Sequence, residues 1–524
     1  MSRRVLAVLT LLVALSTLFS PLERDLFVGD ETKYGQIIRE MRRTGSLLIP
    51  TLEGRPYSHK PPLHFWLMWA LSFPFGTESI WPFVAPSLLA YGLLIWIAGR
   101  LARALFGGEE WLARFIVTSF WLIWGLAQTA RMDLEFTLAI AGAALLIWKW
   151  LGEGGAAPLL GAGALTGLAI FVKGPMALVI VMVLFAAQAL RGKKEWRWSW
   201  AGALAIAVAI PLVWLVPALI AGGRGYSHEL LVTQNLGRAV GAWDHAEPPW
   251  FYLLHFPVTF LPWSLVAVPA LAAVWKRDHG DARAARFCLD WFLAVLVPFS
   301  LLSGKLDVYM APAMIPLGLL IARLLGQAGE DALEAWGRRL SRALVGGLGL
   351  SFAAALAIGP RLLEGEPERA LAEMPLVRAT LLASVAAACI GLAFQLRTSR
   401  AAANAVIAAL VSLFPLVSLG AVLMPVANAA VSSGPLVDAI ALVTVDGTEV
   451  GLYGAPHLWA RDLPPTLREV QYLGAGALGA GGVRPRVLAV RRDKAPELGE
   501  GLAEYRRVGG TTLKGKEFDV YRRE

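Results

Sequence analysis

Apolar stretches long enough to cross a bilayer recur along most of this chain and constrain its fold more than any other feature. A membrane-spanning helix needs about 20 mostly apolar residues. Thirteen candidate segments occur, at residues 5–22, 80–105, 111–129, 134–151, 157–172, 175–190, 199–221, 256–275, 286–303, 307–325, 343–360, 376–396 and 402–424. Hydrophobic residues make up 56% of the 524 positions and charged residues 17%, outside the usual balance of a soluble domain. We therefore predict an α-helical polytopic membrane protein, with residues 5–22 as an uncleaved anchor.

The basic residues between these segments predict which side of the membrane each loop faces. The net charge is +9, but Lys and Arg fall in short clusters on every second connection, which is typical of cytoplasmic loops. We therefore expect membrane lipids, and no nucleic acid, as partners of these charges. The other loops should open together on the outer side, at residues 23–79, 130–133, 173–175, 222–255 and 304–306. The apolar segment 62–76 is short and is expected to be an interfacial or re-entrant helix.

The composition changes near residue 430 to that of a soluble domain. Residues 449–453, 486–491 and 518–522 have the pattern of strands, with helical and Gly-rich stretches between them. We predict a transmembrane domain over 1–429, whose first outer loop 23–79 holds juxtamembrane helices. A small α/β domain outside the membrane should follow over 430–524.

A dense run of charged and aromatic residues lies in the first outer loop, between residues 26 and 66. Ionisable groups beside a bilayer are costly to dehydrate and are kept mainly where they line a cavity or contact a substrate. Asp30 and Glu31 could accept a proton from an acceptor hydroxyl, although Asp30 is equally suited to be a helix N-cap. Lys60 could bind a phosphate or extend to lipid headgroups.

Histidines in two outer loops suggest a metal site. Imidazole and carboxylate groups suit a divalent ion such as zinc. His59 could therefore ligate a metal together with His245 or Glu247.

Further charges interrupt apolar segments at the other outer loops. Asp133 supplies a second carboxylate, with a helix cap or an ion pair to Arg131 as the alternatives. Lys173, Lys305 and Arg238 lie on the side where the positive-inside rule does not place them. Each could merely mark a packing break, but together they indicate an anionic substrate such as a lipid phosphate.

Several short motifs that contain these residues occur in a fixed order along the chain. They are Asp30-Glu31-x-x-Tyr34, Gly54-x-Pro56-Tyr57-x-x-Lys60-Pro61-Pro62, Arg131-x-Asp133, Lys173-Gly174-Pro175, His245-x-x-Pro248-x-x-Phe251-Tyr252 and Lys305-Leu306-x-x-Tyr309. The chain resembles the bacterial branch of the dolichyl-phosphate-mannose protein mannosyltransferase superfamily, which includes the aminoarabinose transferase of lipid A. The resemblance implies a C-type glycosyltransferase (GT-C) fold. It also implies transfer of a sugar from a polyprenyl-phosphate (undecaprenyl-phosphate) donor to a lipid or protein acceptor at the periplasmic face of the bacterial inner membrane.

The resemblance also implies roles for individual residues. Asp30 matches the essential acidic residue of the first outer loop, and Asp133 matches the second acidic position. The remaining matched positions would bind the lipid donor and its phosphate; they are Lys60, Arg238, Lys305, Tyr309, Lys173 and Tyr57. His59 stands where some relatives have Glu, at a position associated with a metal, and Asp307 stands where relatives commonly have Pro.

Two other classes of protein remain open at this point. A lipid or sugar transporter, such as a flippase, can also have many spans with charges among them, but transporters usually show related halves. No such duplication is visible in the sequence. A scaffold that keeps the fold without activity is the third alternative.

Overall fold

The chain forms two compact units in the computed structural model. The described residues are 2–27, 30–191, 199–237, 246–275, 281–326, 332–362, 375–445, 447–460, 463–467, 470–474, 477–478 and 482–523. Unit 1 contains Met1–Phe19, Ser58–Pro61 and Ser87–Val422, and unit 2 contains Ser20–Tyr57, Pro62–Pro86 and Leu423–Glu524. Most of the first outer loop thus shares a compact unit with the C-terminal residues.

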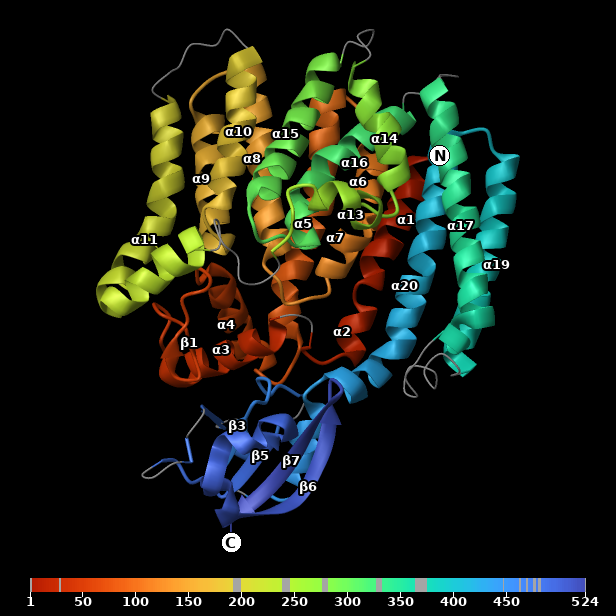
Figure 1. Ribbon diagram of the computed structural model, residues 1–524. Coiled ribbons are helices and arrows are strands. Elements are labelled where there is room, and N and C mark those ends of the chain that lie inside the picture. Colours follow the sequence, from red (N-terminus) through yellow and green to blue (C-terminus); the bar gives the residue numbers. More distant parts are fainter. Residues whose placement is uncertain are drawn as a thin grey trace. The chain divides into compact units, whose positions relative to one another are not determined.

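Unit 1 is built from helices (Figure 1). They are α1 (Arg3–Ser16), α5 (Trp81–Phe106, from Ser87 onward), α6 (Glu110–Ser119), α7 (Trp121–Leu126), α8 (Asp133–Glu153), α9 (Ala157–Lys173), α10 (Met176–Arg191), α11 (Ser199–His228), η1 (Glu229–Gly237), α13 (Phe251–Thr259), α14 (Ser264–Ala272), η2 (Ala273–Trp275), α15 (Ala282–Leu301), η3 (Asp307–Met310), α16 (Ala311–Gly326), α17 (Ala332–Leu362), α19 (Pro375–Arg397) and α20 (Ala401–Val431, as far as Val422).

The predicted multi-pass helical architecture is confirmed. Among the described residues, nine helices are long and apolar enough to cross a membrane, and the bent pair α13 and α14–η2 makes a tenth if it is one span. The other predicted segments are helical but short or broken. Helices α9 and α10 have 17 and 16 residues, about 25 Å at 1.5 Å per residue, and the segment 111–129 is divided at Phe120 into α6 and α7.

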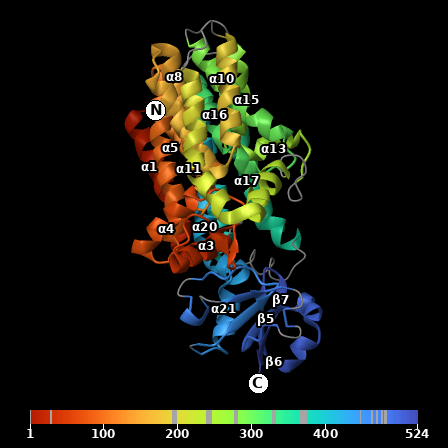
Figure 2. The same ribbon diagram turned by 90° about the vertical axis from the view of Figure 1, so that its left-hand side faces the viewer.

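Small residues let the helices of unit 1 approach closely. A Cβ atom at Gly163 would lie 2.3 Å from the carbonyl oxygen of Ala203, and one at Gly167 would lie 2.9 Å from that of Ala207. Glycines four residues apart therefore give α9 a smooth face against α11, as is usual in packed membrane helices. Helix α11 lies alongside α9, and Figure 2 views unit 1 from the side on which α11 stands.

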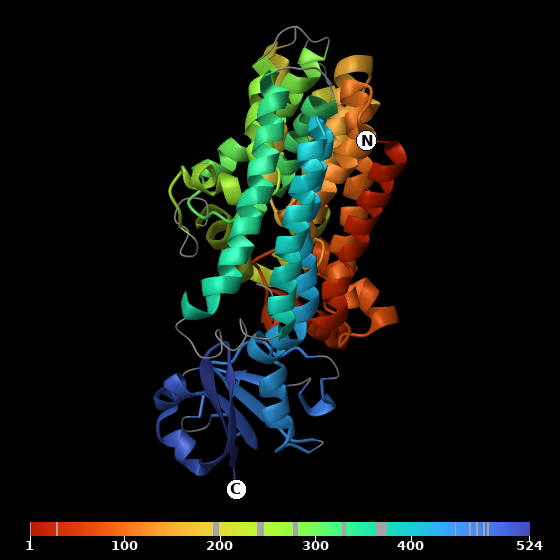
Figure 3. The same ribbon diagram turned by 90° about the vertical axis from the view of Figure 1, so that its right-hand side faces the viewer.

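Three later helices of unit 1 share an apolar core. Helices α17 and α19 run alongside each other (Figure 3). Val345, Ala388, Ala408 and Val411 are buried together where they meet α20.

Unit 2 contains a five-stranded mixed sheet in its C-terminal part. Its order is β4 (Gln471–Leu473), β3 (Val450–Tyr453), β5 (Val487–Arg491), β7 (Lys516–Arg523) and β6 (Tyr505–Leu513). Strand β3 pairs parallel with β4 and β5, and β7 pairs antiparallel with β5 and β6. The predicted strands are β3, β5 and β7, so the α/β character is confirmed, whereas β4 and β6 were not predicted.

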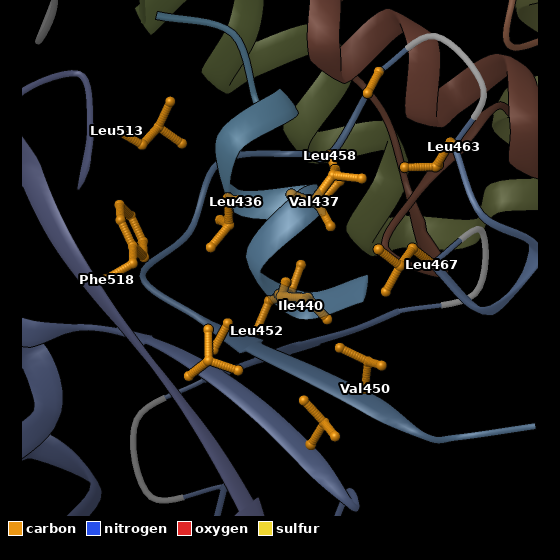
Figure 4. Close-up of a cluster of buried hydrophobic side chains, with 14 residues drawn as sticks. Leu436, Val437, Ile440, Val450, Leu452, Leu458, Leu463, Leu467, Leu513 and Phe518 are labelled. Atoms are coloured by element: carbon orange, nitrogen blue, oxygen red, sulfur yellow. The ribbon is translucent and has the colours of Figure 1, made fainter. Parts of the chain in front are cut away.

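The sheet of unit 2 is covered on both faces. Val450 and Leu452 pack with Leu436 and Ile440 of α21 (Gly434–Ala441), as Figure 4 shows. The alternate residue Tyr453 packs on the other face, against residues of η5 (Arg492–Glu504). This period-2 alternation along β3 buries both sets of side chains.

The remainder of unit 2 is the first outer segment. It contains α2 (Phe19–Glu23), α3 (Glu31–Thr44), the hairpin β1 (Thr51–Leu52) and β2 (Arg55–Pro56), and α4 (Leu63–Phe75). The 13 residues of α4 extend only about 20 Å at 1.5 Å per residue, so this predicted short helix is too short to cross the bilayer. Glu40 of α3 accepts hydrogen bonds from the hydroxyl of Thr51 (2.6 Å) and the backbone N–H of Glu53 (2.7 Å). This buried carboxylate fixes the hairpin onto α3.

Candidate active site

A buried carboxylate with two cationic partners forms the centre of the candidate site in unit 1. An oxygen of Asp133 accepts a hydrogen bond from the Lys173 ammonium at 2.5 Å, and its other oxygen accepts from Arg131 Nε at 3.0 Å. The Asp133 side chain is 3% exposed, Lys173 12% and Arg131 25%. Two basic side chains thus meet one carboxylate at this point.

Local sequence explains how these three residues meet. Asp133 is the first residue of α8, where a carboxylate is favoured by the helix dipole. Lys173 is the last residue of α9, and Gly174 follows with a positive φ of 111°, which lets the chain leave the helix. The carbonyl of Arg131 accepts from the hydroxyl of Ser87 at 2.8 Å. The predicted ion pair between Arg131 and Asp133 is therefore present, with Lys173 as a further partner.

Tyr309 lies beside this cluster. It belongs to η3, its ring stacks on Phe299 of α15 with centroids 5.0 Å apart, and the Lys173 ammonium is 4.7 Å from the Tyr309 centroid. The Phe136 centroid is 5.3 Å from the same ammonium. Aromatic faces attract a desolvated cation, so both rings contribute to the position of the Lys173 ammonium.

Lys305 supports the loop before η3. It is 2% exposed, and its ammonium donates to the carbonyl of Glu247 at 2.6 Å and to the carbonyl of Leu302. Burial lowers the pKa of Lys305 below its usual value. The structure thus places this predicted phosphate ligand against backbone oxygens, where it joins the 246–247 segment to residues 302–305.

Asp307 is held by α13. Its Oδ1 accepts from the Thr259 hydroxyl at 2.5 Å and lies 3.2 Å from His255 Nδ1. Sequence reasoning flagged Asp307 as unusual but did not find these partners, which lie about 50 residues earlier in the chain.

The two acidic residues of the first outer loop have different environments in unit 2. Asp30 occupies the N-cap position of α3, but its side chain makes no capping hydrogen bond. It pairs with Lys33 at 2.9 Å, and both side chains are more than 40% exposed. Glu31 is fully buried, and its two oxygens accept from the guanidinium of Arg24 at 2.6 and 2.7 Å. Glu31 is thus fixed in a buried ion pair.

The remaining predicted residues are distributed over both units. Tyr57 is buried in unit 2 with its ring edge on Phe65, at a centroid distance of 5.8 Å. In unit 1, His59 is exposed and Lys60 half-buried. Arg238 and His245 lie outside the described residues.

The predicted metal site has no counterpart in the part of the chain that the structure describes. No three His, Cys, Asp or Glu side chains group there as metal ligands do. The divalent metal, with His59 and His245 as ligands, stays a prediction.

Comparison with known proteins supports the resemblance seen in the motifs. Residues 59–216 match the family described as dolichyl-phosphate-mannose-protein mannosyltransferase. This range includes Lys60, Asp133 and Lys173. The chain is also similar to two curated proteins named undecaprenyl phosphate-alpha-4-amino-4-deoxy-L-arabinose arabinosyl transferase. The one from Pseudomonas fluorescens (strain Pf0-1) is 29% identical over 57% of this chain and 53% of its own.

The second relative, from Pseudomonas paraeruginosa (strain DSM 24068 / PA7), is 31% identical over 58% of this chain and 56% of its own. This chain thus spans little more than half the length of either relative. The crystal structure of ArnT from Cupriavidus metallidurans bound to undecaprenyl phosphate superposes with a TM-score of 0.74. It covers 98% of this chain and 97% of that one at 19% identity.

The chain has a GT-C fold. The fold expected from the motifs is thereby confirmed over nearly the whole chain. Within this GT-C fold, the Arg131–Asp133–Lys173 cluster brings together three charged side chains that the sequence singled out in unit 1.

Proposed function

We propose that this protein is an integral-membrane glycosyltransferase that takes a sugar from an undecaprenyl-phosphate carrier at the periplasmic face of the bacterial inner membrane. The names of the similar arabinosyl transferases and the matched mannosyltransferase family support this class. The observation that carries the proposal is the Arg131–Asp133–Lys173 cluster, which places two cations beside Tyr309, because a lipid phosphate needs cationic partners at the membrane.

In the proposed reaction, an acceptor oxygen forms a bond to the anomeric carbon of the sugar. The bond from that carbon to the lipid phosphate breaks, and its electron pair leaves with the phosphate. Lys173 and Arg131 stabilise the charge that develops on this leaving group. Asp133 keeps both cations in place, because each of its oxygens accepts from one of them. We therefore assign Asp133 an orienting role.

Asp30 is the proposed acceptor-side carboxylate. Its side chain is 46% exposed, so a substrate can reach it, in contrast to the buried Glu31. Where the acceptor is a hydroxyl, Asp30 takes its proton. Where the acceptor is a phosphate, as on lipid A, no base is needed and Asp30 orients the acceptor. We assign Glu31 a structural role through Arg24.

The names of the similar proteins indicate which sugar donor and which acceptor should be tested first. The two arabinosyl transferases are named for undecaprenyl phosphate-4-amino-4-deoxy-L-arabinose. We propose this amino sugar as donor and a lipid such as lipid A as acceptor, with a protein acceptor as the second candidate.

The decisive experiment uses the full-length protein in proteoliposomes with that donor and lipid A, and follows lipid mass by mass spectrometry. The wild type should add one sugar to the acceptor. Asp30→Asn should transfer at least about tenfold more slowly with a phosphate acceptor and about 10²–10⁴-fold more slowly with a hydroxyl acceptor. Asp438→Asn is the control, since Asp438 is an exposed acid on α21. Wild-type transfer by Asp30→Asn would refute its role, and lipid translocation without any transfer would favour a transporter.

A further inference from the structure

One tryptophan of the C-terminal segment is buried within unit 2. In the sequence, Trp459 lies in the segment that connects β3 to β4, and its side chain is 1% exposed. Its indole N–H donates to the carbonyl of Thr77 at 3.1 Å, and its ring meets that of Phe83 edge-on at 6.1 Å. Its backbone N–H donates to the Ser433 hydroxyl at 2.8 Å. The indole is therefore fixed in one orientation by polar and apolar contacts.

The indole of Trp459 also lies directly against α3. A Cβ atom at Gly35, in the first half of this helix, would be 2.7 Å from Trp459 Cδ1. Glycine is among the least favourable residues inside a helix. The close approach of the indole gives a physical reason for a glycine here, because no larger residue leaves room for the ring.

A second contact one turn later joins the same two segments. Arg39 is buried, and its guanidinium donates to the carbonyl of Leu458. The backbone N–H of Leu458 in turn donates to the Tyr472 hydroxyl at 2.9 Å. Positions 35 and 39 share one helix face, so this face of α3 rests on residues 458 and 459.

The beginning of α3 is tied to the C-terminal part of unit 2 as well. The backbone N–H of Asp25 donates to the Asn428 side chain at 2.9 Å. Arg24, the preceding residue, pairs with Glu31 in the first turn of α3. Asp30 precedes this turn directly, so its position follows that of the helix.

We propose that Trp459 is a positioning residue for Asp30, and that the C-terminal segment is therefore part of the machinery that presents this carboxylate to the acceptor. This inference rests on the proposed transferase function. Trp459 acts through α3: the indole and Gly35 fit together, and the fit sets where the N-terminal end of the helix lies.

The test is a size exchange across this contact in the full-length protein in nanodiscs. Gly35→Ala places a methyl group against the indole, and Trp459→Leu replaces the indole with a smaller apolar side chain. Each single variant should lower kcat at least about tenfold with the KM for the lipid donor within about twofold of the wild type. The double variant should recover to within about threefold, because the shorter side chain makes room for the methyl group. Gly346→Ala and Trp336→Leu are matched controls, since nothing lies within 4 Å of a Cβ at Gly346 and Trp336 is 55% exposed.

Hydrogen exchange provides a readout that does not depend on turnover. Both single variants should exchange faster over residues 31–44 while β3 and β5 stay as protected as in the wild type. Unchanged exchange in α3 would overturn the docking itself. Faster exchange with unchanged kcat would overturn the positioning role, as would a double variant no better than the worse single one. A wild type without transferase activity would instead refute the proposed function, while the exchange data would still test the contact.

Discussion

The ammonium of Lys173 donates to the carboxylate of Asp133 across 2.5 Å and so joins the last residue of α9 to the first residue of α8. Both side chains are largely buried. A buried ion pair adds little stability compared with apolar packing, but the removal of one partner leaves an uncompensated charge. The pair therefore makes the two helix ends depend on each other.

Replacement of Lys173 should destabilise the protein strongly. Lys173→Met leaves Asp133 with Arg131 alone, and we expect a loss of about 3 kcal/mol in the free energy of unfolding. Thermal unfolding in detergent would measure it. Lys33→Met is the matched control, because its pair with Asp30 is exposed and should contribute no more than about 1 kcal/mol. Equal shifts for the two variants would show that Asp133 does not need Lys173.

Substitution of the adjacent carboxylates Asp30 and Glu31 should affect different properties of the protein. Glu31→Gln disrupts a fully buried pair with Arg24 and should destabilise unit 2 by about 3–5 kcal/mol. Asp30→Asn should change stability by less than about 1 kcal/mol and act on turnover instead. Parallel measurement of melting temperature and initial rate separates the two roles. A stable, fully active Glu31→Gln variant would contradict the structural role of that residue.

His457 should make unit 2 sensitive to acid. Burial, with a contribution from the nearby Lys33 cation, lowers the pKa of His457 from 6.5 to about 4. The unfolded chain then binds more protons than the folded chain below pH 6.5. Stability should therefore fall as the pH drops from about 6.5 to 4, by on the order of 3 kcal/mol in total.

A substitution identifies the source of this pH dependence. His457→Gln should flatten the dependence of unit 2 stability between pH 6.5 and 4, followed by hydrogen exchange of β3 and β5. His255→Gln, at a 45% exposed side chain of unit 1, should leave the dependence unchanged. An identical pH profile in the wild type and His457→Gln would assign the effect to other groups.

The glycine face of α9 should tolerate no added volume. Gly163→Ala would place a methyl group 2.3 Å from the backbone oxygen of Ala203, which a side-chain movement cannot relieve. We expect a loss of about 1–3 kcal/mol from overpacking, visible as a lower melting temperature. Gly346→Ala, with nothing within 4 Å of the added Cβ, should be neutral or stabilising.

Much of the fold was predictable because long apolar segments and alternating strands are local signals. Strand β6 was missed for a physical reason: Gly509 and Gly510 interrupt its pattern, and its pairing with β7 shifts register between Arg507 and Gly509. The three-residue β4 is too short to have a pattern of its own.

The candidate site was predictable in part. Asp133, Lys173 and Tyr309 were singled out from separate loops and do lie together. The sequence could not show that Glu31 forms an ion pair with Arg24, or that Lys305 donates to backbone carbonyls. Both contacts depend on burial and on which partner is nearest in the folded chain. The signal that was overlooked is Gly35, a poor helix former in the middle of a charged helix.

The division of unit 2 between the two ends of the polypeptide has a consequence for biogenesis. Residues 20–86 leave the ribosome early, whereas the residues that bury Gly35 and Arg39 come after Leu423. At about 5–20 residues per second the intervening helices take roughly 20 to 70 seconds to synthesise. During that interval the early segment has no finished partner, so its polar side chains stay hydrated until the last hundred or so residues arrive. A ribosome that stalls late would leave helix α3 without the residues that bury Gly35 and Arg39.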